Sequence, residues 1–122
     1  MVSLKQLIKS ATTIVYEGYY LDKYSEIWLN MPNWKKIEYV TEFTFYKGNC
    51  KYTLSKSLYE IPATYYINLL KRGQRRVYLK HCFKTGKFCR HSKVQKHSVV
   101  DFFDALKVIE DAGVFENLTS SE

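Results

Sequence analysis

Residues 53–88 read TLSKSLYEIPATYYINLLKRGQRRVYLKHCFKTGKF, and the interpretation of the whole chain depends on this stretch. Leu54 and Leu58 stand four residues apart, which is the spacing of one face of a helix. Ile61-Pro62 follows, and the residue before a proline avoids the α region. A short helix is therefore expected over residues 53–60.

A second helix is expected directly after the first, over Pro62–Arg72. Proline suits the first turn of a helix, and Ile67 and Leu70 recur at helical spacing. Gly73 is a natural stop. In this helix Ile67 and Leu70 face the core.

Beyond Gly73 the pattern changes to the alternation of a β-strand. Four residues share one face of the expected strand: Val77, Leu79, His81 and Phe83. The segment Lys84-Thr85-Gly86-Lys87 predicts a tight turn that brings Phe88 back opposite Phe83. The stretch thus ends in a basic hairpin.

Two short helices followed by a basic hairpin resemble the winged-helix form of the helix-turn-helix DNA-binding domain. In that family the second helix enters the major groove, and the hairpin lies along the backbone or the minor groove. The resemblance implies that Pro62–Arg72 is the recognition helix and that Arg75–Phe88 is the wing. It implies that the recognition helix exposes Thr64, Tyr65, Asn68 and Lys71. The alternative is a helix and hairpin of another α+β core, in which Tyr65 and Tyr66 merely pack.

Charge is concentrated in one part of the chain. The 122 residues carry a formal net charge of +7, yet no acidic residue lies between Glu60 and Asp101. That interval holds these basic residues: Lys71, Arg72, Arg75, Arg76, Lys80, Lys84, Lys87, Arg90, Lys93 and Lys96. Such a run favours a polyanionic partner, because each neutralised phosphate releases condensed counterions. The alternative is a solvated cationic face that maintains solubility.

The N-terminal third has helical patterns over Ser3–Glu17 and over Tyr20–Leu29. The segment Asn33–Tyr46 fits two structures. As a helix it supplies the first helix of a winged-helix domain, whereas as a strand it is rich in β-branched and aromatic residues. In the strand interpretation Lys47-Gly48-Asn49 forms a hairpin turn into residues 50–53. We adopt the helix, because it matches the neighbouring motif.

Near the C-terminus, Ser98 is expected to cap an amphipathic helix that ends at Gly113. Its apolar face comprises Val99, Phe102, Phe103, Leu106, Ile109 and Ala112. The expected fold class is α+β, with a single winged-helix-like domain and extra N-terminal and C-terminal helices. Residues 1–32 form an N-terminal helical extension, and residues 33–122 form the winged-helix-like domain with its basic hairpin and C-terminal helix.

Candidate metal ligands gather near the hairpin. His81, Cys82, Cys89, His91 and His97 have the side chains that zinc prefers, and Cys82 and Cys89 are expected to face each other across the hairpin. The usual C-x2-C spacing is absent, so we expect packed thiols and neither a metal nor a cofactor. The chain also contains no glycine-rich phosphate loop and no G-x-S-x-G motif, which argues against an enzyme.

We therefore expect a small, non-catalytic nucleic-acid-binding protein, with DNA favoured. Its size and its Lys and Tyr content are similar to those of accessory proteins that assist replication or transcription of phages and other mobile genetic elements. No apolar run approaches the ~20 residues of a membrane span, and three cysteines without an export signal fit a cytoplasmic protein. The alternative is a protein–protein inhibitor or adaptor whose basic face docks on an acidic partner or on a nucleic-acid enzyme.

The expected nucleic-acid contacts fall into two groups. Thr64, Tyr65 and Asn68 are candidates for base contact, because Asn can read adenine and Tyr can stack on bases. The expected backbone contacts are Lys71, Arg72, Arg75, Arg76, Lys80, Lys84, Lys87 and Arg90.

Overall fold

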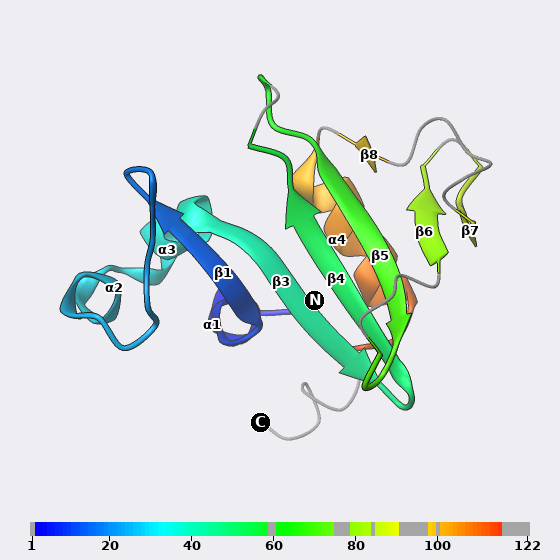
Figure 1. Ribbon diagram of the computed structural model, residues 1–122, viewed down its shortest axis with the longest axis horizontal. Helices are drawn as coiled ribbons and strands as arrows, with labels where there is room; N and C mark the ends of the chain where they lie inside the picture. The colour runs from blue at the N-terminus through cyan, green and yellow to red at the C-terminus, as the bar shows by residue number, and fades with distance from the viewer. Residues whose placement is uncertain are drawn as a thin grey trace.

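The structure is a computed structural model that describes residues 2–58, 61–74, 79–83, 85–90, 98–99 and 101–115 (Figure 1). The helices are α1 (Leu4–Lys9), α2 (Glu26–Asn30), α3 (Asn33–Tyr39) and α4 (Phe102–Asp111). The strands are β1 (Ala11–Tyr16), β2 (Tyr19–Tyr20), β3 (Val40–Lys47), β4 (Cys50–Lys56), β5 (Tyr65–Lys71), β6 (Leu79–Cys82), β7 (Lys87–Cys89) and β8 (Ser98–Val99). The class is mixed α+β, as the sequence predicts, and strands outweigh helices.

One antiparallel sheet organises these elements. Its strand order is β2-β1-β3-β4-β5-β6-β7, and β8 pairs with β5 next to β6. The long strands β3, β4 and β5 form the centre of the sheet, and α4 lies behind β4 and β5 (Figure 1). The N-terminal segment joins the same sheet, because β1 pairs with β3.

The central β3–β4 hairpin confirms the strand interpretation of the ambiguous segment. Lys47 pairs with Cys50, which leaves Gly48 and Asn49 as a two-residue turn. Gly48 has a φ of 57°, and a glycine at the first turn position suits the turns that match the twist of a hairpin. The expectation of a helix is right only for α3, which ends at Tyr39 before β3 begins.

The two helices expected over residues 53–72 are both wrong. Residues 50–56 form β4, and residues 65–71 of the expected recognition helix form β5. The apolar pairs Leu54/Leu58 and Ile67/Leu70 fit helical spacing. Seven residues of β4 nevertheless pair with seven residues of β5, and this pairing fixes both segments as strands. Tertiary pairing therefore overrides a short local pattern. Residues 50–56 and 65–71 therefore do not form the two helices on which the winged-helix resemblance is based.

The helices expected over Ser3–Glu17 and Tyr20–Leu29 are longer than the helices in the structure. Only Leu4–Lys9 of the first segment is helical, and the chain then enters β1. In the second segment, Tyr19–Tyr20 form β2 and the helix is restricted to Glu26–Asn30. A run of β-branched residues, TTIV within β1, favours the strand once β3 is available as a partner.

The basic hairpin is present, with a register that differs from the prediction. His81 pairs with Phe88 across β6 and β7, so the predicted opposition of Phe88 and Phe83 is wrong. The turn begins earlier than expected, because β6 ends at Cys82. Val77 and Lys84 lie outside the described residues.

The C-terminal helix is confirmed, but it begins later than predicted. Its N-cap is Asp101, whose carboxylate accepts a hydrogen bond from the Phe103 backbone N–H at 2.8 Å. The expected cap, Ser98, belongs to β8. Leu106 and Ile109 are buried as predicted, whereas Phe103 is 75% exposed.

The core lies between the sheet and the helices. Ile67 and Leu54 are fully buried there, and Phe102 of α4 packs against Phe43 of β3 with ring centroids 5.8 Å apart. A second aromatic contact joins Phe45 to Phe115 at 5.1 Å. We call this side of the sheet the helix face.

Candidate functional site

The opposite side of the sheet, which we call the open face, carries short hydroxyl side chains, tyrosines and cations. No helix of the described residues packs on it. Strand alternation and the observed contacts assign these residues to it: Thr12, Thr13, Thr41, Glu42, Thr44, Tyr46, Lys51, Thr53, Ser55, Tyr66, Asn68, Leu70, Arg72, Lys80, Cys82, Lys87 and Cys89. Irregular pairing between β1 and β3 places Thr12 with Thr13, and Thr41 with Glu42, on this same side.

Two tyrosines of the open face are paired with cations. The Arg72 guanidinium lies over the Tyr46 ring, 4.7 Å from its centroid, and the Lys80 ammonium lies 5.3 Å from the centroid of Tyr66. Tyr46 is 51% exposed. Each pair thus offers an aromatic ring next to a positive charge.

The middle of the open face is a floor of short side chains. Thr44, Thr53 and Ser55 lie side by side on β3 and β4 and are buried between their longer neighbours. The Thr44 and Thr12 hydroxyls hydrogen-bond to each other at 3.0 Å. Thr12 also donates to the Glu42 carboxylate at 3.2 Å, so the acidic side chain of this face is engaged within the sheet.

A polar depression of about 280 Å³ continues the floor toward β1 and β2. It is lined by Thr13, Val15, Tyr20, Thr41, Glu42, Ser55, Lys56, Ser57, Leu58 and Tyr66. Tyr66 belongs both to this depression and to the pair with Lys80. The depression and the floor therefore form one continuous polar surface.

The residues predicted to contact bases do not lie together. Thr64 is buried, with its hydroxyl unpaired among the described residues, and Tyr65 packs against Phe102 on the helix face at 5.2 Å. The prediction that these two face solvent is wrong, because residue 65 points to the helix face of a strand. Asn68 does lie on the open face, next to Lys80 across the β5–β6 pair. Its side-chain oxygen is buried and has no hydrogen-bond partner among the described residues.

The predicted phosphate contacts divide in the same way. Arg72, Lys80 and Lys87 lie on the open face, and Lys71 is an exposed residue on the other side of β5. Arg90 is exposed directly after β7. Three further predicted contacts fall outside the described residues: Arg75, Arg76 and Lys84.

Tyr46, Lys51 and Tyr66 are among the members of the open face that the sequence analysis does not predict as contacts. The signal was present in the strand interpretation, since Glu42, Thr44 and Tyr46 alternate with apolar residues. The expected helix over Pro62–Arg72 does not include Tyr66 in its exposed set, and only the alternation of β5 places Tyr66 on the open face.

The back of the hairpin is an aromatic cluster. His81 is buried between Phe83 and Phe88, with ring centroids 4.4 and 5.0 Å away, and Phe88 also contacts Tyr52 at 5.9 Å. Burial lowers the pKa of His81, and a hydrogen bond to the Gly86 backbone opposes that shift. His81 is therefore a packed side chain of the hairpin, and Phe88 links this cluster to Tyr52 of β4.

The cysteines of the hairpin are free thiols. Cys89 donates to the Lys80 carbonyl with a sulfur–oxygen distance of 3.7 Å, and burial together with the neighbouring Cys82 raises the pKa of the Cys89 thiol. Within the described ranges, no three His, Cys, Asp or Glu side chains gather as metal ligands. The candidate ligands His91 and His97 lie beyond those ranges.

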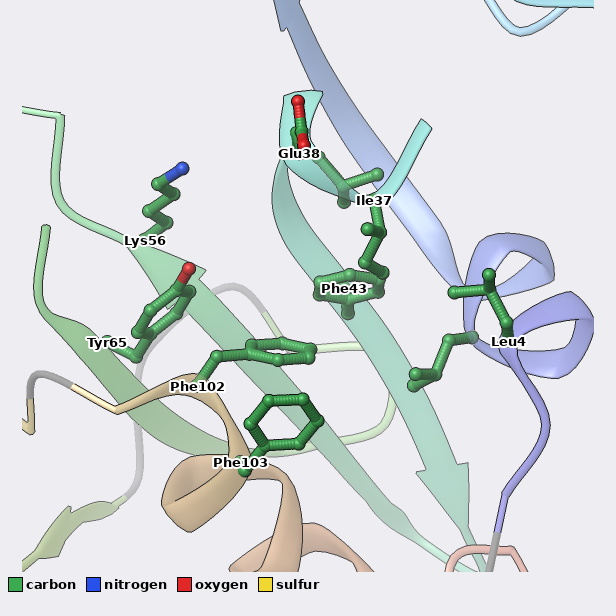
Figure 2. Close-up of a pocket in the computed structure, with 10 residues that line it drawn as sticks. Leu4, Ile37, Glu38, Phe43, Lys56, Tyr65, Phe102 and Phe103 are labelled. Atoms are coloured by element: carbon green, nitrogen blue, oxygen red, sulfur yellow. The ribbon is translucent and has the colours of Figure 1, made fainter. Parts of the chain in front are cut away.

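An apolar cavity of about 390 Å³ opens on the helix side between α1, α3, α4 and the sheet (Figure 2). Its walls include Leu4, Phe43, Phe102 and Phe103, and Lys56, Glu38 and the Tyr65 hydroxyl lie at one end (Figure 2). Burial, with a smaller contribution from Asp101, raises the pKa of Tyr65. The Tyr65 hydroxyl lies on the same side of the cavity as Lys56 (Figure 2).

Comparisons with known proteins give no lead to function. No family model and no curated protein matches the sequence, and no solved structure matches the fold. In the part of the chain that the structure describes, no helix is both long and apolar enough to cross a membrane. The site itself must therefore carry any functional conclusion.

Proposed function

We propose that this chain is a non-catalytic nucleic-acid-binding protein that uses the open face of its sheet together with the basic β6–β7 hairpin. The observation that carries the proposal is the arrangement of Lys51, Arg72, Lys80 and Lys87 on one face with two tyrosines, the exposed Tyr46 and the half-buried Tyr66. The acidic residue assigned to that face, Glu42, accepts a hydrogen bond from the Thr12 hydroxyl. A surface of this composition attracts phosphates and releases their counterions.

The remaining predicted contacts stay part of the proposal. Arg75, Arg76 and Lys84 belong to the same acid-free run of the sequence. The favoured nucleic acid is DNA, and the proposed location of the protein is the cytoplasm. The proposed role is that of an accessory protein in replication or transcription of a phage or other mobile genetic element. Binding through a recognition helix at 62–72 is not proposed, because this segment contains β5.

Salt dependence tests the proposal. Lys80→Ala/Lys87→Ala removes two cations of the open face and should flatten the slope of log K against log salt by up to ~2. Lys5→Ala/Lys9→Ala changes the net charge equally from exposed positions on α1, and it should leave the slope unchanged. Equal slopes for the wild type and the Lys80→Ala/Lys87→Ala variant would contradict the proposal. If an acidic polypeptide binds this face and DNA does not compete, the face is instead a protein-docking surface.

A further inference from the structure

The tyrosine–cation pairs allow the proposed function to be made more specific. A nucleotide carries a flat base next to a charged phosphate, and the open face presents rings next to cations at Tyr46/Arg72 and Tyr66/Lys80. Base–aromatic stacking needs a base that is free of its pairing partner. The described residues contain three cation–π contacts, and two of them lie on this face.

The width of the surface argues against reading a duplex. Tyr46 on β3 and Lys80 on β6 are three strand spacings apart, which is roughly 14 Å. The major groove of B-DNA is about 12 Å wide and admits a helix or a two-stranded ribbon. The open face is therefore too wide to enter the groove, and bases can reach its tyrosines only by leaving a duplex.

The spacing of the two rings points in the same direction. Tyr46 is aligned with Leu70 through Lys51, and Tyr66 lies four residues along β5 from Leu70, so the two tyrosine Cα atoms are roughly 16 Å apart. Neighbouring bases in a helical stack are about 3.4 Å apart. An extended strand with separated bases can reach both rings, whereas two adjacent stacked bases cannot.

We infer that the open face binds a single strand of nucleic acid, with bases stacked on Tyr46 and Tyr66 and phosphates next to Arg72 and Lys80. The buried floor of Thr44, Thr53 and Ser55 lies below the path of the strand. This inference rests on the proposed function, since it needs the same cations. It adds that unpaired bases, and not phosphates alone, determine affinity.

The test uses the whole chain and five probes of roughly 16 nucleotides. These are single-stranded DNA, single-stranded RNA of the same sequence, the two corresponding duplexes, and a DNA strand that lacks bases. We expect at least one single strand to bind more than about fivefold tighter than its duplex and than the base-free strand. Tighter binding of the DNA strand or of the RNA strand identifies the sugar that the open face prefers. Equal binding of single strands, duplexes and the base-free strand would overturn the inference.

Matched variants assign the effect to the rings. Tyr46→Leu and Tyr66→Leu should each weaken single-strand binding by about 5- to 150-fold and leave base-free binding unchanged. Tyr46→Phe and Tyr66→Phe keep the ring and should bind like the wild type. Tyr24→Leu, at a tyrosine that is 87% exposed and lies just before α2, should have no effect. Wild-type affinity in both leucine variants would contradict stacking.

Failure of the inference can be told from failure of the proposed function. If only the inference fails, all nucleic acids bind alike, the leucine variants behave like the wild type, and Lys80→Ala/Lys87→Ala still flattens the salt slope. If the proposed function fails, none of the five probes binds, or binding is indifferent to those lysines.

Discussion

The two faces of the central sheet are made from the same strands, yet their side chains have opposite properties. On β5, Tyr65 packs against Phe102 and Ile67 is fully buried, whereas the intervening Tyr66 pairs with Lys80. The charges differ as well, since α4 and its cap present four acidic residues, Asp101, Asp104, Glu110 and Asp111, against Lys107. The open face instead gathers cations. Period-two alternation thus separates the stabilising half of each strand from the half that is free to bind a ligand.

Removal of a core side chain should break the helix face most strongly. Ile67→Ala leaves a cavity at a site with 0% exposure and should lower the free energy of unfolding by about 2–5 kcal/mol. Lys51→Ala, on the open face of the adjacent strand, should stay within about 0.5 kcal/mol of the wild type. Chemical denaturation measures both. A similar loss in the two variants would show that both faces support the fold.

Two adjacent tyrosines offer the sharpest comparison. Tyr65→Ala should cost about 2–3 kcal/mol, less than a fully buried aromatic residue, because its ring is half-buried against Phe102. Tyr66→Ala should change stability less and weaken single-strand binding. Thermal melts and a binding titration on each variant give the result. The reverse pattern, with binding lost at Tyr65 and stability lost at Tyr66, would mean that β5 is rotated.

A matched pair of charge reversals tests the electrostatic difference. Lys51→Glu on the open face and Lys107→Glu on α4 change the net charge equally. Only Lys51→Glu should weaken nucleic-acid binding and reduce the slope of log K against log salt by ~1. The reason is that salt screens charges that are farther than about 10 Å from a phosphate. Equal effects in titrations at two salt concentrations would indicate attraction by net charge alone.

The smallest expected effect concerns pH and the aromatic cluster behind the hairpin. Burial lowers the pKa of His81, so the unfolded chain takes up a proton at a higher pH than the folded chain. The stability contributed by neutral His81 is complete above its unfolded pKa of about 6.5 and is lost as the pH falls through and below that value. The loss is at most ~1.4 kcal/mol per pH unit for one proton. His81→Phe should remove this component from melting curves recorded between about pH 7.5 and 5.5.

Several features of the fold could be predicted from the sequence because they depend on local chemistry. The basic hairpin, the C-terminal amphipathic helix and the Gly48 turn each have a local signal in turn residues or periodicity. The cations Arg72, Lys80 and Lys87 of the candidate site were also predictable, since they come from the acid-free run. The aromatic half of that site was missed because Tyr46 and Tyr66 belong to the open face only if their segments are strands.

The sequence by itself determined the mixed class, the position of the positive charge and the burial of Ile67 and Leu70. It could not decide that residues 50–56 and 65–71 are strands, because short apolar runs suit a helix or a strand equally. Only pairing with β3 and between β4 and β5 removed that ambiguity, by satisfying backbone hydrogen bonds across the sheet. The same pairing placed Ile67 and Leu70 on opposite faces and brought Tyr46 beside Arg72, two residues that are distant in the chain. Composition therefore supplied the cations, and tertiary structure decided which aromatic rings they accompany.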